Sequence, residues 1–184
     1  MYFVCYFYEA FVSFFNFTEK KSSNMAVNIR KITAADNVAT AAMIRTILEE
    51  FKIDKPGTVY TDPTTDRLSV LFEHPGSAYW LAEEDGEIIG GCGIYPTEGL
   101  PAGCVELVKL YTSAASRGKG VGKMLMEKSI ESAQHFGYNE IYLESFPELT
   151  TAIAMYEKTG FKKLSAPLGN WGHFACNVWM LLVL

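Results

Sequence analysis

Three glycines close together, Gly118, Gly120 and Gly122, separate an apolar stretch of this 184-residue chain from an amphipathic one. Glycine leaves the main chain uncovered and adopts backbone conformations that other residues avoid. The first turn of a helix has N–H groups without partners and the positive end of the helix dipole. Arg117 and Lys119 bring further positive charge to the segment. The pattern predicts a loop that opens a helix and binds a pyrophosphate group.

Two common nucleotide-binding motifs do not fit this loop. A P-loop requires glycine at position 117 and Ser or Thr at position 124, whereas the chain has Arg117 and Met124. The dinucleotide-binding fingerprint requires a third glycine where Lys123 stands. The segment alone also fits an ordinary solvated helix start, so it needs support from elsewhere in the chain.

The composition is that of one globular domain with a mild acidic balance. Hydrophobic residues make up 49% and charged residues 20% of the chain, which is long enough to bury a core. The formal net charge of −5 argues against general nucleic-acid binding. This balance suits a cationic amine substrate, and it equally suits simple solubility.

The cysteines and histidines form no recognisable framework. No C-x-x-C pair occurs among Cys5, Cys92, Cys104 and Cys176. We expect these side chains to be unpaired thiols in a reducing compartment, the cytoplasm. The three histidines, His74, His135 and His173, are equally dispersed, so we expect no metal site.

The first 24 residues differ from the rest because they are rich in aromatic residues. A secretory signal requires basic residues near its start, but no Lys or Arg precedes Lys20. The apolar stretch is also too short to span a membrane, and Glu9 interrupts it. Met25 opens a clear strand pattern, so we expect residues 1–24 to be an extension outside the native fold and residues 25–184 to be the domain. The alternative is an arm that contacts membranes or forms dimers.

Beyond Met25, strand and helix patterns alternate without an internal repeat. Alternation or short apolar runs predict strands at 27–32, 78–82, 87–95, 104–112, 140–145, 161–165 and 174–183. Helical spacing predicts helices at 36–51, with Asp36 as the cap, and at 66–72, 121–136 and 149–158. The helix at 121–136 should direct Val121, Leu125, Ser129, Ala133 and Phe136 to the core. The pattern indicates an α/β domain with a mixed, largely antiparallel sheet.

Two separate motifs resemble those of the GNAT N-acetyltransferases. The spacing Arg-x-x-Gly-x-Gly, read as Arg117, Gly120 and Gly122, resembles the acetyl-CoA signature of that family. The run Tyr-Glu-Lys-Thr-Gly-Phe at 156–161 resembles the end of the family's last long helix. The resemblance extends over residues 25–184. It implies a central sheet splayed between the fourth and fifth strands, and direct transfer of an acetyl group from acetyl-CoA to an amine. Many members of the family are homodimers, so a homodimer is possible for this chain as well.

The resemblance also assigns the residues that would bind acetyl-CoA. They are the fourth strand and the glycine loop: Leu110, Tyr111, Thr112, Arg117, Gly118, Lys119, Gly120, Val121, Gly122 and Lys123. A backbone N–H near Leu110 or Tyr111 would face the thioester oxygen. The chain departs from the family at Ala114, where proline is common, and at Leu149, where an asparagine often helps to hold coenzyme A. Thr150 or Thr151 is a candidate replacement.

The same resemblance nominates a catalytic acid and a base. Tyr156 occupies the family's tyrosine position, where a phenol would protonate the leaving thiolate; the alternative is simple aromatic packing. Glu106 is the first candidate for the base and Glu144 the second, although carboxylates on strands are often only solvated edge residues. Some members of the family deprotonate the amine through water alone. The two carboxylates could also share the binding of a cationic amine.

The acceptor is the least visible part of the sequence. Family logic nominates Tyr60, Tyr95 and the loop at 170–174, in which His173 is more simply a structural residue than a base. We expect a small-molecule amine as acceptor. Acetylation of a protein lysine or N-terminus, transfer of a longer acyl group, and a sensor that binds acyl-CoA without turnover remain alternatives.

Overall fold

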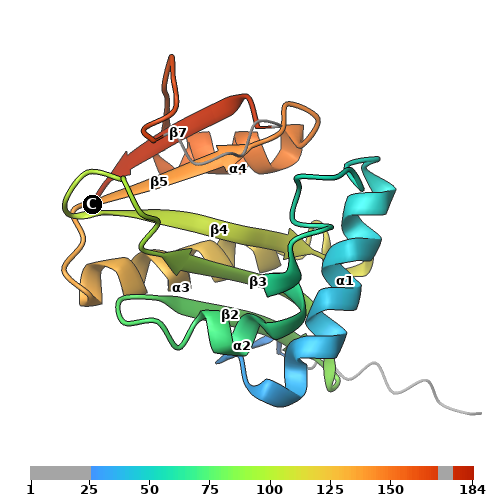
Figure 1. Ribbon diagram of the computed structural model, residues 1–184. Coiled ribbons are helices and arrows are strands. Elements are labelled where there is room, and N and C mark those ends of the chain that lie inside the picture. Colours follow the sequence, from blue (N-terminus) through green and yellow to red (C-terminus); the bar gives the residue numbers. More distant parts are fainter. Residues whose placement is uncertain (1–25, 170–175) are drawn as a thin grey trace, which may run out of the picture.

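The computed structural model describes residues 26–169 and 176–184 (Figure 1). The expected extension at 1–24, Met25, and the loop at 170–174 with His173 lie outside the described residues. The helices are α1 (Asn37–Glu50), α2 (Leu68–Leu71), α3 (Val121–His135) and α4 (Thr150–Thr159), with 3₁₀ turns η1 (Ala34–Asp36), η2 (Pro63–Arg67) and η3 (Ala114–Ser116). The strands are β1 (Asn28–Lys31), β2 (Ala78–Glu84), β3 (Glu87–Tyr95), β4 (Cys104–Thr112), β5 (Glu140–Ser145), β6 (Lys162–Lys163) and β7 (Val178–Val183).

The described strands form one sheet in the order β1-β2-β3-β4-β5-β7-β6, and every neighbouring pair except β4–β5 is antiparallel. The predicted mixed, largely antiparallel sheet is therefore confirmed. Successive residues of β2 enter different hydrophobic clusters: Ala82 packs with the cluster of α3, and Leu81 with that of α1 and α2. The helices thus cover both faces of the sheet, as Figure 1 shows for α1 and α3.

The sheet opens between β4 and β5. Their register pairs only Cys104, Val105 and Glu106 with residues of β5. Among the described residues the rest of β4 has no strand partner on that side, and in Figure 1 the β5–β7–α4 layer diverges from the other strands. Parallel pairing that stops after three residues leaves a wedge in the middle of the sheet, as the splay expected between the fourth and fifth strands requires.

Local sequence signals account for most boundaries. The β2–β3 hairpin turns on Asp85 (φ 54°) and Gly86 (φ 82°), and this pair of left-handed residues gives the two-residue turn that fits twisted strands. Gly137 and Gly160, with φ of 82° and 111°, follow α3 and α4. At these positions only glycine avoids a steric cost.

Three local expectations were wrong. Asp36 stands at the N-cap position of α1, as predicted, but its side chain does not cap the helix, because its carboxylate instead accepts hydrogen bonds from Arg30 and Thr33. Phe136 is 41% exposed, because it follows the last residue of α3, whereas Met126, which was not predicted to face the core, is fully buried. The two closing strands are shorter than predicted: Phe161 precedes β6 as a buried core residue, and β7 begins only at Val178.

Candidate active site

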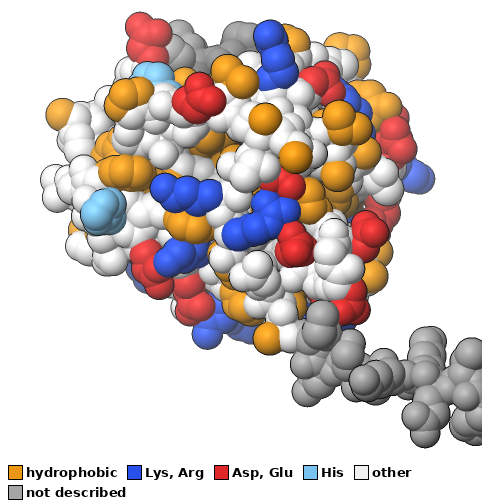
Figure 2. Space-filling view, turned by 90° about the horizontal axis from the view of Figure 1, so that it is seen from below, with side chains coloured by type: hydrophobic (Ala, Val, Ile, Leu, Met, Phe, Trp, Pro, Cys, Tyr) orange, Lys and Arg blue, Asp and Glu red, His pale blue; other side chains and the backbone are white. Residues whose placement is uncertain are grey.

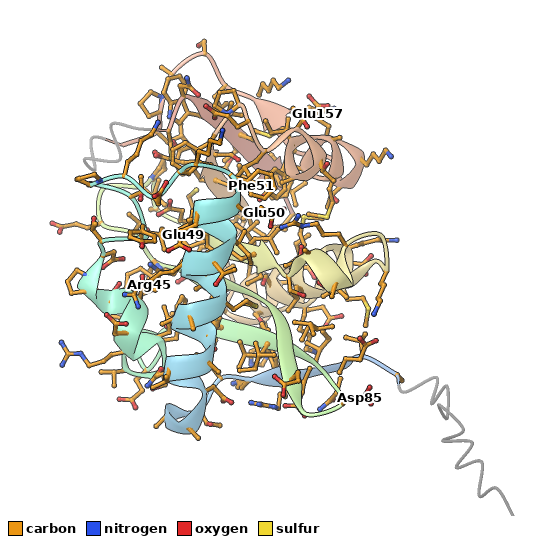
Figure 3. The ribbon with its side chains drawn as sticks, turned by 90° about the vertical axis from the view of Figure 1, so that its right-hand side faces the viewer. Arg45, Glu49, Glu50, Phe51, Asp85 and Glu157 are labelled. Atoms are coloured by element: carbon orange, nitrogen blue, oxygen red, sulfur yellow. The ribbon has the colours of Figure 1, made fainter. Side chains whose placement is uncertain are left out.

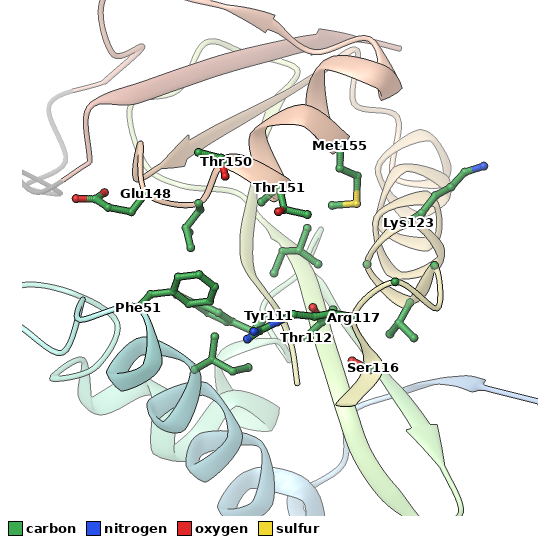
Figure 4. A pocket seen from close by; sticks show the side chains of 18 residues that line it. Phe51, Tyr111, Thr112, Ser116, Arg117, Lys123, Glu148, Thr150, Thr151 and Met155 are labelled. Atoms are coloured by element: carbon green, nitrogen blue, oxygen red, sulfur yellow. The ribbon is translucent and has the colours of Figure 1, made fainter. Parts of the chain in front are cut away.

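A cavity of about 410 Å³ lies at the splay between β4 and β5 (Figure 4). Four parts of the chain line it: the end of α1, the free end of β4 (the part beyond Glu106, which has no aligned partner on β5), the glycine loop with the start of α3, and α4 with the residues just before it. The lining residues are Ile47, Phe51, Leu110, Tyr111, Thr112, Ser116, Arg117, Gly118, Gly120, Val121, Gly122, Lys123, Glu148, Leu149, Thr150, Thr151, Ala152 and Met155. Nine of the ten residues predicted to bind acetyl-CoA are among them; Lys119 is not.

The glycine loop presents bare main chain to this cavity. Gly118 and Gly120 have φ of 78° and 79°, and a Cβ built on either would have no heavy atom within 4 Å. Gly120 is the N-cap of α3, and no side chain caps that helix. The first-turn N–H groups of α3 therefore begin beside open space, which is the arrangement that suits an anion.

The cations of the loop pair with carboxylates from elsewhere. Arg117 forms a forked ion pair with Glu50, in which Nη2 lies 2.6 Å from Oε2, and its guanidinium lies 5.1 Å from the ring centroid of Phe51. Figure 3 places Glu50 and Phe51 at the C-terminal end of α1. Lys119 Nζ lies 2.8 Å from Glu84 Oε2. A phosphate entering the cavity would compete with Glu50 for Arg117.

The free end of β4 forms the floor of the cavity. Leu110, Tyr111 and Thr112 line it. The register aligns Tyr111 and Thr112 with residues of β3, whereas Leu110 has no aligned partner on β3 or on β5. Leu110 therefore lies outside the regular ladder.

Tyr156 lies in the core beside the cavity rather than in its lining. Its side chain is 6% exposed, and its ring centroid is 5.7 Å from that of Phe161. Ala152, one turn earlier on the same face of α4, does line the cavity. Burial, with smaller contributions from Cys92 and Tyr111, raises the pKa of the Tyr156 phenol well above its ordinary value. The hydroxyl therefore stays protonated at neutral pH.

Glu106 and Glu144 lie near the apex of the splay. Glu106 is 8% exposed, accepts a hydrogen bond from the Thr97 hydroxyl, and pairs in register with Tyr142 at the last aligned position of β4 and β5. The Tyr142 hydroxyl donates to Glu144 Oε1 at 2.8 Å. Burial raises the pKa of the Cys176 thiol to about 12, and both Glu144 and Glu106 add to that shift. The two carboxylates therefore act on one neighbourhood, although neither lines the cavity.

The two tyrosines that the sequence nominates for acceptor recognition, Tyr60 and Tyr95, make separate contacts. The Tyr60 hydroxyl donates to Glu49 Oε1 at 2.8 Å, while Tyr95 packs against Phe72 and His74 with centroids 5.9 and 5.3 Å apart. Neither tyrosine lines the cavity.

Sequence reasoning missed several lining residues. Four lining residues lie on α1 and α4 or just beside them: Ile47, Phe51, Glu148 and Met155. The apolar periodicity of the two helices predicted only burial, because it does not distinguish a core contact from a cavity wall. Leu149, Thr150 and Thr151 all line the cavity, so the replacement of the family's asparagine by Thr150 or Thr151 stays a prediction.

Other features of the described residues concern the cysteines, the surface charge and the lengths of the helices. Cys92, Cys104 and Cys176 are free thiols, as expected. On the face shown in Figure 2, basic and acidic side chains are interspersed rather than gathered by sign. Residues 26–169 and 176–184 contain no helix with the length and apolarity needed to cross a membrane.

Comparison with known proteins gives a consistent result. A model of the acetyltransferase (GNAT) family matches residues 42–161. The uncharacterized N-acetyltransferase YjgM of Escherichia coli (strain K12) is 41% identical over 155 residues, which are 83% of this chain and 92% of that protein. A GNAT-family acetyltransferase structure from Staphylococcus aureus Mu50 has a TM-score of 0.75 at 21% identity, covering 85% of this chain and 98% of that chain.

A second solved structure contains the acyl donor. The phosphinothricin acetyltransferase from Sinorhizobium meliloti, in complex with AcCoA, has a TM-score of 0.68 at 21% identity, covering 87% of this chain and 89% of that chain. At such identities the two solved structures establish a common fold.

Proposed function

This chain belongs to the GNAT acetyltransferase family and is an acyltransferase of that family; on this premise we propose that it transfers an acetyl group from acetyl-CoA to the primary amine of a small molecule. The observation that carries the proposal is the cavity at the splay, with an uncapped helix start and left-handed glycines on one side and the free end of β4 on the other.

These residues fit acetyl-CoA, which supplies a reactive acetyl thioester. The N–H groups at the start of α3 would bind the pyrophosphate, and Arg117 would exchange Glu50 for a phosphate oxygen. The apolar floor at Leu110 and Tyr111 suits the uncharged arm of the donor. The main-chain N–H of Leu110 or Tyr111 is the proposed donor to the thioester oxygen, which gains negative charge during transfer.

Tyr156 is the proposed general acid. Its raised pKa keeps the proton on the phenol, so the hydroxyl can donate a hydrogen bond to the departing sulfur. A free thiol has a pKa of about 8.5, so proton transfer from a phenol of higher pKa is uphill, and Tyr156 acts first as a hydrogen-bond donor that stabilises the departing thiolate. We therefore expect no descending limb from Tyr156 in the pH–rate profile below about pH 10.

Glu106 is the proposed base, with Glu144 as its partner in binding a cationic acceptor. An amine must lose a proton before it can attack, and a carboxylate beside it both attracts the cation and accepts that proton. Both glutamates influence Cys176, which indicates that they face one region at the apex of the splay.

The test joins binding and turnover. Calorimetric titration with acetyl-CoA would precede a thiol-release assay against amino acids, polyamines, other small amines and peptides. Acceptor-dependent thiol release with a small amine supports the proposal. Release with peptides alone would move the substrate class to proteins, binding without release would indicate a sensor, and no binding would refute the donor.

The Tyr156→Phe variant tests the acid. We expect turnover to fall by about 10²-fold while the affinity for acetyl-CoA changes little, because only a proton donor is removed. Tyr138→Phe is the matched control: its hydroxyl donates to the Gly76 carbonyl at 3.0 Å, and it does not line the cavity. Equal turnover in the two variants would remove Tyr156 from the mechanism.

A further inference from the structure

The free end of β4 contains an irregularity that the proposed mechanism does not explain. Gly91 of β3 is aligned with Tyr111 of β4, and Gly93 with Val108. The two aligned pairs are thus two residues apart on β3 but three residues apart on β4. Lys109 and Leu110 therefore face a single residue of β3, which is a bulge. Lys109 has φ of 52°, a left-handed conformation that is unfavourable for a residue with a Cβ. Such a conformation persists only where neighbouring groups hold it.

One of these groups is Tyr79, which reaches the bulge from two strands away. Its hydroxyl donates to the Lys109 carbonyl oxygen at 3.0 Å, and the residue is 1% exposed. Tyr79 belongs to β2 and is aligned with Gly93 of β3, so the side chain must cross β3 to reach β4.

The glycines of β3 make this crossing possible. A Cβ at Gly91 would lie 2.5 Å from the Tyr79 hydroxyl oxygen, and one at Gly93 would lie 2.6 Å from Cδ2 of the same ring. Real Cβ atoms do not approach other atoms so closely, so any side chain at either position would displace the tyrosine. The glycine-rich run of β3 is thus a passage for Tyr79.

The second group is an ion pair on the side chain of Lys109. Lys109 Nζ lies 2.8 Å from Asp62 Oδ2, and the lysine side chain is only 8% exposed. Asp62 also accepts hydrogen bonds from the Thr64 N–H at 2.8 Å and from the Thr64 hydroxyl at 2.7 Å, which fix its orientation at the start of η2. The bulge is therefore held at its carbonyl and at its ammonium group.

We propose that Tyr79 is a positioning residue for acetyl transfer: by holding the Lys109 carbonyl, it fixes the peptide unit that joins Lys109 to Leu110, and hence the direction of the Leu110 N–H on the opposite side of that unit. This inference rests on the proposed function, because it assigns that stretch of main chain a place at the reacting group. Tyr79 does not itself line the cavity. Its effect passes through the backbone of one residue.

The test compares Tyr79→Phe with Tyr138→Phe. Each substitution deletes one phenol-to-carbonyl hydrogen bond of 3.0 Å and keeps the ring, but only the first bond reaches the bulge. We expect similar small losses of thermal stability. Tyr79→Phe alone should lower kcat by about 10-fold, with less than about a 3-fold change in the KM for acetyl-CoA, because a displaced donor weakens the transition state most.

A second readout needs no turnover. Hydrogen–deuterium exchange of the unliganded protein should be about 10-fold faster at residues 109–112 in Tyr79→Phe than in wild type or Tyr138→Phe, since β4 loses one of its supports there. Unchanged exchange at 109–112 would overturn the inference whether or not the protein turns over. Faster exchange with kcat equal to that of Tyr138→Phe would also overturn it, because the bulge would then not direct the chemistry. If wild type neither binds acetyl-CoA nor releases thiol, the proposed function fails, and the role at the reacting group fails with it; exchange then reports only whether Tyr79 holds the bulge.

Discussion

Replacing Gly120 by alanine should destabilise the fold through the backbone alone. Gly120 has φ of 79°, and no heavy atom lies within 4 Å of the Cβ position, so the new methyl group meets nothing. A left-handed alanine costs about 1–2 kcal/mol, of which about 0.4–1 kcal/mol is offset because alanine restricts the unfolded chain. The expected net loss is about 1 kcal/mol, or about 2–4 °C in Tm for a domain of this size.

Gly122→Ala should have the opposite sign. Gly122 lies in the first turn of α3 without a positive φ, and its Cβ would meet Met155 Sδ at 3.4 Å, an ordinary contact. Alanine is favoured over glycine inside a helix by about 0.5–1 kcal/mol, so Tm should rise slightly. Thermal unfolding of the unliganded variants measures both effects. The reasoning fails if Gly120→Ala is as stable as wild type, or if Gly122→Ala loses as much stability.

Gly57→Ala separates stability from binding. Gly57 has φ of 82° and an equally open Cβ position, but it does not line the cavity. It should therefore cost as much stability as Gly120→Ala. Only Gly120→Ala should also weaken acetyl-CoA in a calorimetric titration, because its strained residue caps the helix that receives the pyrophosphate. Equal affinities in the two variants would place the phosphates elsewhere.

Two further predictions concern charged pairs. Glu50→Gln should strengthen acetyl-CoA binding by about two- to five-fold at low salt, because Arg117 no longer has to leave a carboxylate. The control is Glu49→Gln on the same helix, which should have no such effect. A weaker or unchanged affinity in Glu50→Gln would contradict the competition between Glu50 and the phosphate for Arg117. Burial raises the pKa of Asp62, but hydrogen bonds from Lys109 and Thr64 outweigh it, so the pKa lies below its ordinary value. The stability that comes from this depressed pKa is present above the unfolded pKa of about 3.9 and is lost as the pH falls through the folded value. The Tm deficit of Asp62→Asn relative to wild type should therefore be full at pH 7 and should shrink below about pH 4. A pH-independent deficit would show that the ion pair is not its source.

Local signals in the sequence were enough for the main elements. The bounds of β4 and β5 and the start of α3 follow from apolar runs that end at turn residues, and the two motifs indicated the family. The failures were local as well. Phe136 satisfies helical spacing, but the helix ends one residue before it, and periodicity does not determine where a terminal turn stops.

The contacts that complete the site could not be predicted in this way, because they join distant parts of the chain. Arg117 and Glu50 are 67 residues apart, Lys109 and Asp62 are 47 apart, and Tyr79 and Lys109 are 30 apart. Each partner has an adequate local explanation as a solvated charge or a core aromatic residue. Only the order of the strands brings them together, and strand order is not encoded in the period of a single segment.

The same interruption of pairing creates both the cavity and the need to support β4. A strand that leaves β5 after Glu106 exposes main chain that can bind a donor, and it keeps only the ladder with β3, which the bulge interrupts. The support comes instead from β2, through Tyr79, and from the start of η2, through Asp62. Asp62 lies in the segment between α1 and α2, close in sequence to Tyr60, which the family resemblance nominates for acceptor recognition. It follows that a change in this segment reaches the main chain of β4 through one ion pair. Substitutions that alter acceptor preference there should also change the kinetics with acetyl-CoA.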